Sequence, residues 1–485
     1  MQGLDTASSR PVSLASQSHG QPTLTRDEIS KMIEVNWDDL FSMDRSEVEA
    51  FQLSAARRRF EELKPKIRAL QVHADSLAVN RIDRLTDLIP LLFLDSVYKS
   101  YPLPLVEKGR WDLLTRWLNG YTTLDLSGVD VSGCTGIDSW LSRLEAETPL
   151  RALHTTGTSG KLSFFPRSSY EVDIWSEGFL KVMQGFKDDK GIKLGKGGER
   201  MPVIIPIPRY AFYIAQRNLD YLQEHVAPTP DKLFTLNQSR LSADLLSLAG
   251  RIRIAQAKGN LHQMTLSEPL RIAMRSYLAD LERRPAEQGE FFRRIADELA
   301  GQRVFMSSPG NILLEAARAG RERGLSRVFA SDSCGMTSSG GKVALPDDWL
   351  QQISEFSGLF TWRGCYAMTE MVSLVPGCLH GRYHPAPWLV PFLLDPETGS
   401  PLPREGTVQG RFAYLDLLAQ TNWGGIISGD RVTMTWDEPC ACGRKGPYLH
   451  SEISRYSAAL TGEDKITCAA QVDNTDAALH QLLAV

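Results

Sequence analysis

Between residues 303 and 363 the sequence alternates between strand-like and helix-like stretches, and this alternation limits the possible folds more than any other feature. The strand-like stretches are "RVFMSS", "SRVFAS" and "LFTWRG". Between them lie "PGNILLEAARAGRERG" and "PDDWLQQISEFSG", which have Pro at the start and Gly at the end, as helices often do. Strands that alternate with helices of this size form parallel βαβ units. We therefore predict an α/β fold built on parallel strands.

Two earlier segments extend this pattern. The run "MPVIIPIP", residues 201–208, is short, apolar and rich in β-branched side chains, and it predicts a buried strand. A helix is predicted over residues 267–282, with Ser267 as its N-cap and Pro269 in its first turn. The apolar face of this helix would consist of Leu270, Met274, Leu278 and Leu281.

Shifts in composition divide the chain into five parts. Residues 1–24 are rich in Ser, Gln and Gly and lack the basic and apolar segments of a secretory signal, so we predict a flexible tail. The other predicted parts are a mainly helical part (25–150), an α/β core (151–395), a β-rich subdomain (396–455) and a short C-terminal tail (456–485). The turn-forming stretch "DPETGSPLPREG" predicts a surface hairpin or loop.

Length and composition are those of a globular protein, with 485 residues, 42% of them hydrophobic and 23% charged. The net charge of −4 provides no basic field that would attract nucleic acid. No apolar run approaches the roughly 18–20 residues of a membrane-spanning helix. Seven cysteines, an odd number, argue against a disulfide framework and for a reducing cytoplasm. We therefore expect a cytoplasmic protein that binds neither nucleic acid nor membrane.

A stretch of small hydroxyls and glycines, "LHTTGTSGKLSFF" (153–165), has the composition of a phosphate-binding loop. Glycines allow backbone N–H groups to converge on an anion, and hydroxyls add donors. The stretch is not a Walker A loop, because that motif would need Gly where Thr155 stands and Ser or Thr where Leu162 stands. Taken alone, it fits an ordinary Ser/Thr turn equally well. Two further polar stretches, "SDSCGMTSSGGK" and "CYAMTEM", follow predicted strands, where ligands bind in parallel sheets.

Four short motifs occur in the order "TTGTSGKLS", "SSGGK", "YAMTE" and "SGDRV". Together they resemble the motifs of the adenylate-forming superfamily, and within it the phenylacetate-CoA ligase branch, over about residues 150–460. The resemblance implies a large adenylate-forming N-terminal domain with βαβ sheets and a small β-rich subdomain. It also implies that the 151–395 core binds a nucleotide. ATP and Mg²⁺ are the cofactors that this family uses.

The resemblance also implies roles for individual residues. Tyr366 would stack on adenine, Thr369 would lie near the α-phosphate, Glu370 would hold magnesium, Asp430 would bind the ribose hydroxyls and Arg455 would lie at the hinge. The loop over the β- and γ-phosphates would comprise Thr155, Thr156, Gly157, Thr158, Ser159, Gly160 and Lys161. The adenine pocket would include Ser339, Gly340 and Gly341. The residues expected to be catalytic are Thr158, Thr369, Glu370 and Lys465.

The chain departs from the family at three places. Leu162-Ser163 replace the usual Pro-Lys, and Ala367 replaces a common Gly. Only 30 residues follow Arg455, so we expect the full-sized C-terminal lid domain, which carries a catalytic lysine in the family, to be absent. Lys465 is a candidate replacement for that lysine, and only its position in the sequence supports this role. Cys468 resembles the acyl-accepting cysteine of acyl-protein synthetases, or is a small apolar residue that packs the last helix.

A set of cysteines and histidines follows the Glu370 motif. Thiolates and imidazoles suit a structural zinc ion with four tetrahedral ligands, and some phenylacetate-CoA ligase relatives carry a similar set. The expected ligands are Cys378, His384, Cys440 and Cys442, with His380 as a substitute for His384. Such a zinc would tie the ribose loop to the loop after Glu370. The alternative is two unconnected cysteine features in turns.

These features predict an ATP-dependent ligase that activates a carboxylic acid, aromatic or another small organic or fatty acid, to an acyl-adenylate. The acyl group would pass to a thiol, either CoA or a protein cysteine. One alternative is an acyl-AMP or acyl-protein synthetase that feeds a partner reductase or carrier protein. Another is a catalytically degenerate, zinc-stabilised nucleotide-binding module. A homodimer is compatible with each of these hypotheses.

Overall fold

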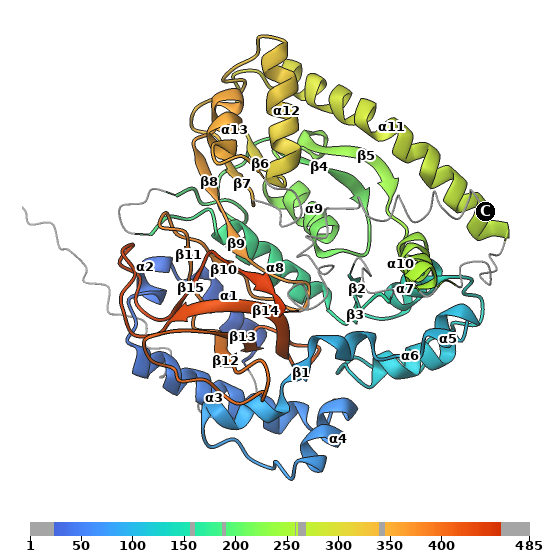
Figure 1. Cartoon of the computed structure of the whole chain (residues 1–485), viewed down its shortest axis with the longest axis vertical. Coiled ribbons are helices and arrows are strands. Elements are labelled where there is room, and N and C mark those ends of the chain that lie inside the picture. Colours follow the sequence, from blue (N-terminus) through green and yellow to red (C-terminus); the bar gives the residue numbers. More distant parts are fainter. Residues whose placement is uncertain are drawn as a thin grey trace, which may run out of the picture.

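The computed structural model describes residues 24–155, 161–186, 191–257, 259, 268–338 and 345–456. Figure 1 shows two groups of strands, one flanked by helices α9, α11, α12 and α13 and the other beside the blue N-terminal helices. None of the helices in the described part of the chain has both the length and the apolar character needed to cross a membrane.

The first group is a five-stranded sheet in the order β5-β4-β6-β7-β8, and all its neighbouring strands run parallel. This arrangement confirms the predicted parallel βαβ architecture. The strands are β4 (Val203–Tyr210), β5 (Leu233–Arg240), β6 (Phe305–Ser307), β7 (Cys334–Met336) and β8 (Thr361–Arg363). The helical connections are α9 (Ile214–His225), η4 (Pro230–Lys232), α10 (Ala243–Ala257), α11 (Glu268–Glu298), α12 (Gly310–Glu322) and α13 (Trp349–Ser357).

One strand prediction was wrong. The stretch "SRVFAS" is not a strand, and the strand between β6 and β8 is β7, a few residues later. The backbone N–H groups of Arg327, Val328 and Phe329 donate to the last carbonyls of α13, those of Glu355, Phe356 and Ser357. The apolar stretch therefore caps a helix C-terminus and buries Val328 and Phe329 there, so it does not pair with strands.

The predicted 267–282 helix is present but longer. α11 runs on to Glu298 and contains Pro285. Met274 and Leu278 of the predicted apolar face are buried. Ser267 and the side chains of Pro269, Leu270 and Leu281 lie outside the described residues.

The second group is a seven-stranded sheet. Its main path is antiparallel in the order β11-β15-β14-β13-β12, while β1 pairs parallel and β16 antiparallel with β14. The bounds are β1 (Phe93–Leu94), β11 (Arg382–Tyr383), β12 (Leu389–Leu394), β13 (Thr407–Asp416), β14 (Gly425–Thr435), β15 (Tyr448–His450) and β16 (Ser454–Arg455). Residues 395–406 form a mostly exposed connection between β12 and β13, which agrees with the predicted surface loop.

The N-terminal helices pack on this second sheet. Residues of the first helices share one hydrophobic core with β12, β13 and β14, although they lie more than 300 positions away in the sequence (Figure 1). These helices are α1 (Arg26–Glu34), α2 (Trp37–Leu40), α3 (Arg45–Leu63) and α4 (Arg68–Ser76). They are followed by η2 (Leu85–Leu91), η3 (Asp95–Lys99), α5 (Leu103–Glu107), α6 (Trp111–Asn119) and α7 (Ile137–Glu147).

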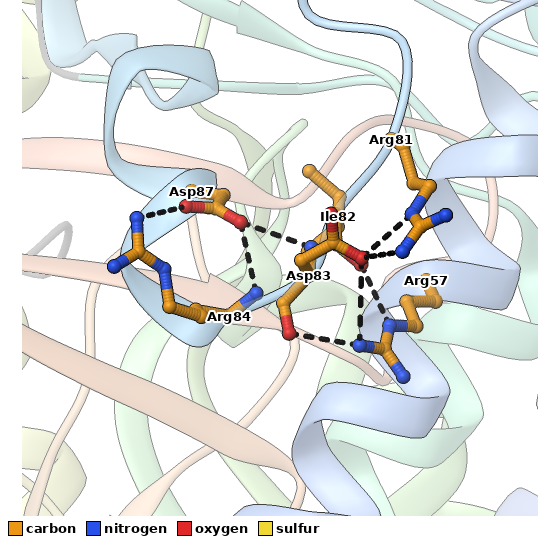
Figure 2. A network of polar contacts seen from close by, with 6 residues as sticks. All are labelled: Arg57, Arg81, Ile82, Asp83, Arg84 and Asp87. Carbon is orange, nitrogen blue, oxygen red and sulfur yellow. Dashed lines mark hydrogen bonds and ion pairs between the residues drawn. The ribbon is translucent and has the colours of Figure 1, made fainter.

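A polar network ties α3 to the segment before η2, as Figure 2 shows. Arg57 donates from Nε to the carbonyl of Ile82 at 2.6 Å and from Nη2 to that of Asp83 at 2.8 Å. The carboxylate of Asp87 accepts from the backbone N–H groups of Asp83 and Arg84 and so caps η2. These charges are largely exposed, so their ion pairs add little to the stability of the fold. The network mainly holds the segment before η2 in place against α3.

The N-termini of α7 and α10 cap each other. Asp244 accepts from the N–H groups of Ile137 and Asp138, and Asp138 accepts from Ala243 and Asp244 and from the hydroxyl of Ser242. Each carboxylate thus satisfies backbone donors that the other helix cannot pair internally. Gly136 makes this approach possible, because a Cβ there would lie 2.6 Å from an Asp244 oxygen.

Candidate active site

Two short hairpins and the strand β14 carry the motif residues that lie in the described part of the chain. The hairpins are β2 (Leu153–His154) with β3 (Phe164–Phe165), and β9 (Cys365–Tyr366) with β10 (Val375–Pro376). Helix α8 (Ser169–Lys181) follows the first hairpin. The expected site residues outside the described part are Thr156, Gly157, Thr158, Ser159, Gly160, Ser339, Gly340, Gly341, Lys465 and Cys468.

Thr155 closes the first hairpin at the edge of the hydroxyl-rich stretch. Its N–H donates to the carbonyl of Ser163 at 3.2 Å, and its hydroxyl accepts from the N–H of Ser163 at 3.1 Å. Lys161 lies on the same hairpin, and its ammonium donates to the carbonyls of Lys99 (2.9 Å) and Tyr101. Burial lowers the pKa of Lys161. This lysine therefore attaches the base of the hairpin to the segment after η3.

The turn at Thr369 and Glu370 is held from two sides. From one side Arg167, which is 2% exposed, donates from Nη2 to the carbonyls of Glu370 at 2.6 Å and Thr369 at 3.3 Å. From the other side the fully buried carboxylate of Asp416 accepts from the N–H groups of Val372 and Ser373, both at 2.8 Å. The Ser373 hydroxyl adds a donor at 2.6 Å. The backbone around Glu370 is thus fixed by two buried charges of opposite sign.

The Glu370 side chain is buried among charged groups of both signs. Burial raises the pKa of Glu370 to about 7; the nearby carboxylates of Asp95 and Asp430 add to this, while Arg455 opposes it. Asp95 lies close to these groups, because a Cβ on Gly429 would meet its Oδ2 at 3.6 Å and Arg455 Nη1 at 4.0 Å. A buried carboxyl whose pKa is raised by neighbouring carboxylates lies in a favourable environment for a cation. Hard oxygen ligands of this kind suit Mg²⁺.

Tyr366, Asp430 and Arg455 form a chain of contacts beside Glu370. The hydroxyl of Tyr366 donates to Asp430 Oδ2 at 2.6 Å, and Arg455 Nε lies 3.3 Å from Asp430 Oδ1. Asp430 and Arg455 are also paired across β14 and β16. Burial raises the pKa of Asp430, although Arg455 and the Tyr366 hydroxyl oppose this rise. Burial, and then the Asp430 carboxylate, raises the pKa of Tyr366 well above its usual value.

The four expected zinc ligands come together. The ligand atoms of Cys378, His384, Cys440 and Cys442 all lie within 4.8 Å of one another. Cys378 Sγ is 3.9 Å from Cys440 Sγ, and Cys442 Sγ is 3.5 Å from His384 Nε2. With zinc bonds of about 2.3 Å to sulfur and about 2.0 Å to nitrogen, a tetrahedral site would place two sulfurs about 3.8 Å apart, and a sulfur and a nitrogen about 3.5 Å apart. These contacts therefore fit a tetrahedral metal site. His380, the alternative ligand, is exposed.

The surroundings of this cluster link it to the N-terminal helices. Phe41, which follows α2, packs its ring 5.8 Å from that of His384. Arg444 is buried, with its guanidinium 5.3 Å from the Phe41 ring, and donates to Cys442 Sγ at 3.6 Å. Hydrogen bonding from Cys378, and then from His384, lowers the pKa of Cys442, although burial opposes this shift. The cluster thus favours a thiolate where a metal would bind.

Several residues that shape this site belong to none of the quoted motifs. They are Arg167 and Asp416 around the Glu370 turn, and Asp95 beside Glu370 and Asp430. The available signal was weak: a charged residue inside an apolar stretch, as in "FFPRSS" and "FAYLDLLA". Such a residue must find partners when it is buried, but the sequence does not say which ones.

Comparison with solved structures identifies a similar fold. A 2-hydroxyisobutyryl-CoA ligase, in the postadenylation state and in complex with R3-HIB-AMP, matches 88% of this chain and 72% of its own chain, with a TM-score of 0.50 and 12% identity. An open conformation of the same ligase in complex with 2-HIB-AMP and CoA matches 85% and 76% of the two chains, with a TM-score of 0.49 and 12% identity. No protein-family model matches the chain, and no curated protein does so. The first likeness confirms the predicted fold class, an α/β fold with parallel strands and a smaller β-rich part.

Proposed function

We propose that the protein is an adenylate-forming ligase that uses ATP to activate a carboxylic acid. The observation that carries this proposal is the convergence of separate motif segments. The hairpin of Thr155 is joined through Arg167 to the turn of Glu370, and Glu370 lies beside the chain formed by Tyr366, Asp430 and Arg455. Their order along the sequence and their proximity in space both fit one nucleotide site.

The proposed reaction begins when the carboxylate of the acid attacks the α-phosphorus of ATP. The bond to the pyrophosphate oxygen breaks, and acyl-AMP and pyrophosphate form. Glu370 would hold Mg²⁺, which would neutralise charge that develops on the phosphates. Thr369 would contact the α-phosphate, Asp430 would accept from the ribose hydroxyls, and the ring of Tyr366 would face the adenine. Residues 155–161 would supply donors to the outer phosphates.

For the second step, we propose that the thiol of CoA attacks the acyl carbon of acyl-AMP, so that a thioester forms and AMP leaves. This is the reaction of a phenylacetate-CoA ligase-like enzyme acting on an aromatic or other small acid. The fold-level match is itself named a CoA ligase, which supports a thiol acceptor. The alternative acceptor is a protein cysteine, with Cys468 as the candidate in this chain and a reductase or carrier protein as the next partner. The cytoplasmic location and the homodimer stay predictions from the sequence.

We also propose a structural zinc ion on Cys378, His384, Cys440 and Cys442. Its support is that the four ligand atoms lie within 4.8 Å of one another, with two separations, 3.9 Å and 3.5 Å, close to those of a tetrahedral site. Bound there, the metal would join the loop after β10 to the turn between β14 and β15, and β14 carries Asp430. The metal would therefore hold the ribose side of the nucleotide site in place without taking part in the reaction.

The test is acid-dependent exchange of pyrophosphate into ATP, measured with pooled aryl and fatty acids. Glu370→Gln is expected to reduce the exchange at least about 100-fold, because it removes a charged ligand for the metal. Glu405→Gln, a matched change at an exposed position, should leave the exchange unchanged. Added CoA should then yield a thioester. Folded, metal-replete protein that binds ATP but exchanges no pyrophosphate with any acid would instead support the degenerate nucleotide-binding module.

A further inference from the structure

We propose that Arg167 is a positioning residue that sets the affinity of the Glu370 site for magnesium. It would do so by holding the Thr369–Glu370 turn in a fixed position relative to the hairpin that carries Thr155. This inference rests on the proposed adenylation function and adds to it a residue outside the recognised motifs. The side chain of Arg167 donates to the backbone carbonyls of Thr369 and Glu370, so it acts through the backbone of the turn.

The backbone of Arg167 belongs to the Thr155 hairpin. The residue lies just after β3, and its carbonyl accepts from the N–H of Arg151 at 2.7 Å, on the segment leading into β2. The next residue, Ser168, forms a bridge with Leu150. Arg167 is therefore anchored to the same two-stranded unit that flanks the hydroxyl-rich stretch. Its side chain then reaches a turn 203 residues further along the chain.

The cost of burying this side chain indicates that the contact is specific. Arg167 is 2% exposed, and its Nη1 has no hydrogen-bond partner among the described residues. A buried guanidinium that is not fully paired is expensive, and an apolar residue would avoid this cost. In return, one guanidinium nitrogen of Arg167 donates hydrogen bonds to the carbonyls of both Thr369 and Glu370. The planar guanidinium can hold both carbonyls in one orientation, whereas a lysine ammonium offers a single point of charge.

The geometry of the turn explains why magnesium affinity is the expected readout. Asp416 and Ser373 restrain the residues just after Glu370, so the turn keeps one of its two restraints when Arg167 is changed. The Glu370 carboxylate then remains present but is less fixed in direction. Mg²⁺ requires near-ideal octahedral geometry and tolerates misplaced ligands poorly. A loosened turn should therefore raise the magnesium requirement before it abolishes the reaction.

The experiment measures pyrophosphate exchange as a function of Mg²⁺ concentration in Arg167→Lys. We expect the half-maximal Mg²⁺ concentration to rise about tenfold, with the rate at saturating Mg²⁺ within about threefold of the parent protein. Arg151→Lys is the matched control, because Arg151 also donates to two backbone carbonyls, those of Leu150 and Glu145, but does not reach the turn. It should change neither quantity.

A second variant keeps the test decisive if Arg167→Lys fails to fold. Arg167→Gln removes the charge but keeps an amide donor for the turn carbonyls, and it should also raise the Mg²⁺ requirement of the folded protein. A purely structural role for Arg167 would lower the melting temperature without a shift in the Mg²⁺ profile of the folded fraction, and that result would overturn the proposal. If Arg167→Lys does not fold and folded Arg167→Gln has the Mg²⁺ profile of the parent protein, the proposal also fails. If the parent protein shows no exchange at all, the adenylation proposal fails instead.

Discussion

Tyr366 bonds to Asp430 through a hydroxyl that an adenine-stacking role does not require. The bond is 2.6 Å long, and the acceptor is a carboxylate that is only 4% exposed. In Tyr366→Phe the ring is kept, but Asp430 loses a donor. We expect the variant to be about 1–3 kcal/mol less stable, the usual cost of leaving a buried charged acceptor without a partner. Urea unfolding would measure this difference.

The control for this prediction is Tyr383→Phe. The ring of Tyr383 lies 6.3 Å from that of Tyr366, so the same atom is removed from a neighbouring ring. We expect a change below about 0.5 kcal/mol there. Equal stabilities of the two variants would mean that the Tyr366 hydroxyl does not stabilise Asp430.

At this scale, the sequence could identify motif residues but not the residues that hold them. Tyr366, Thr369, Glu370 and Asp430 belong to short patterns whose chemistry can be recognised without a structure. Arg167 and Asp416 act on backbone atoms far away in the sequence, and neither has a local pattern. Their partners depend on tertiary packing, which a single sequence does not reveal.

Among the elements, the mutual caps of α7 and α10 make the stability of the folded protein depend on pH. Burial, and then the neighbouring Asp138, raises the pKa of Asp244 to about 6 from its ordinary 3.8. Because the folded state binds this proton more tightly than the unfolded state, its contribution to stability is complete below about pH 3.8. The contribution is lost as the pH rises through about 6.

Asp244→Asn removes this titration. The stability of the parent protein relative to the variant should therefore fall by about 1–3 kcal/mol between pH 4 and pH 7. Urea unfolding of both proteins at several pH values measures the difference and cancels the titration of groups that do not interact with Asp244. A difference that stays constant over this range, or that rises with pH, would show that Asp244 does not carry a raised pKa.

Element prediction succeeded where local patterns and tertiary packing agree. Strands such as β4 and β6 and helices such as α12 follow from apolar runs and from end residues. The pattern failed at "SRVFAS", because a short apolar run can bury its side chains equally well while its N–H groups cap a helix. The length of α11 was also underestimated, because Pro285 lies inside the helix and does not end it.

For the whole molecule, the proposed zinc ion predicts a dependence of stability on metal. The purified protein should contain about one zinc per chain, as measured by elemental analysis. Cys442→Ser should lose this zinc and melt several degrees lower, because metal binding to the folded state contributes to its stability. Cys134→Ser, which lies outside the cluster, should keep both the zinc and the melting temperature. Metal-free protein with unchanged melting would contradict a structural role.

The N-terminal helices pack on the second sheet, so they are synthesised long before the strands that cover them. The indole of Trp423 donates to the carbonyl of Leu91, 332 residues earlier, and Arg59 on α3 donates to the carbonyls of Ala419, Asn422 and Trp423. At about 5–20 residues per second, a ribosome needs roughly 20–70 seconds to make the chain between such partners. During that time the apolar faces of α1 to α4 have no sheet to cover them. The nascent chain therefore cannot bury these faces until the strands of the second sheet have been made. Until then, α1 to α4 are the helices that a chaperone would have to shield.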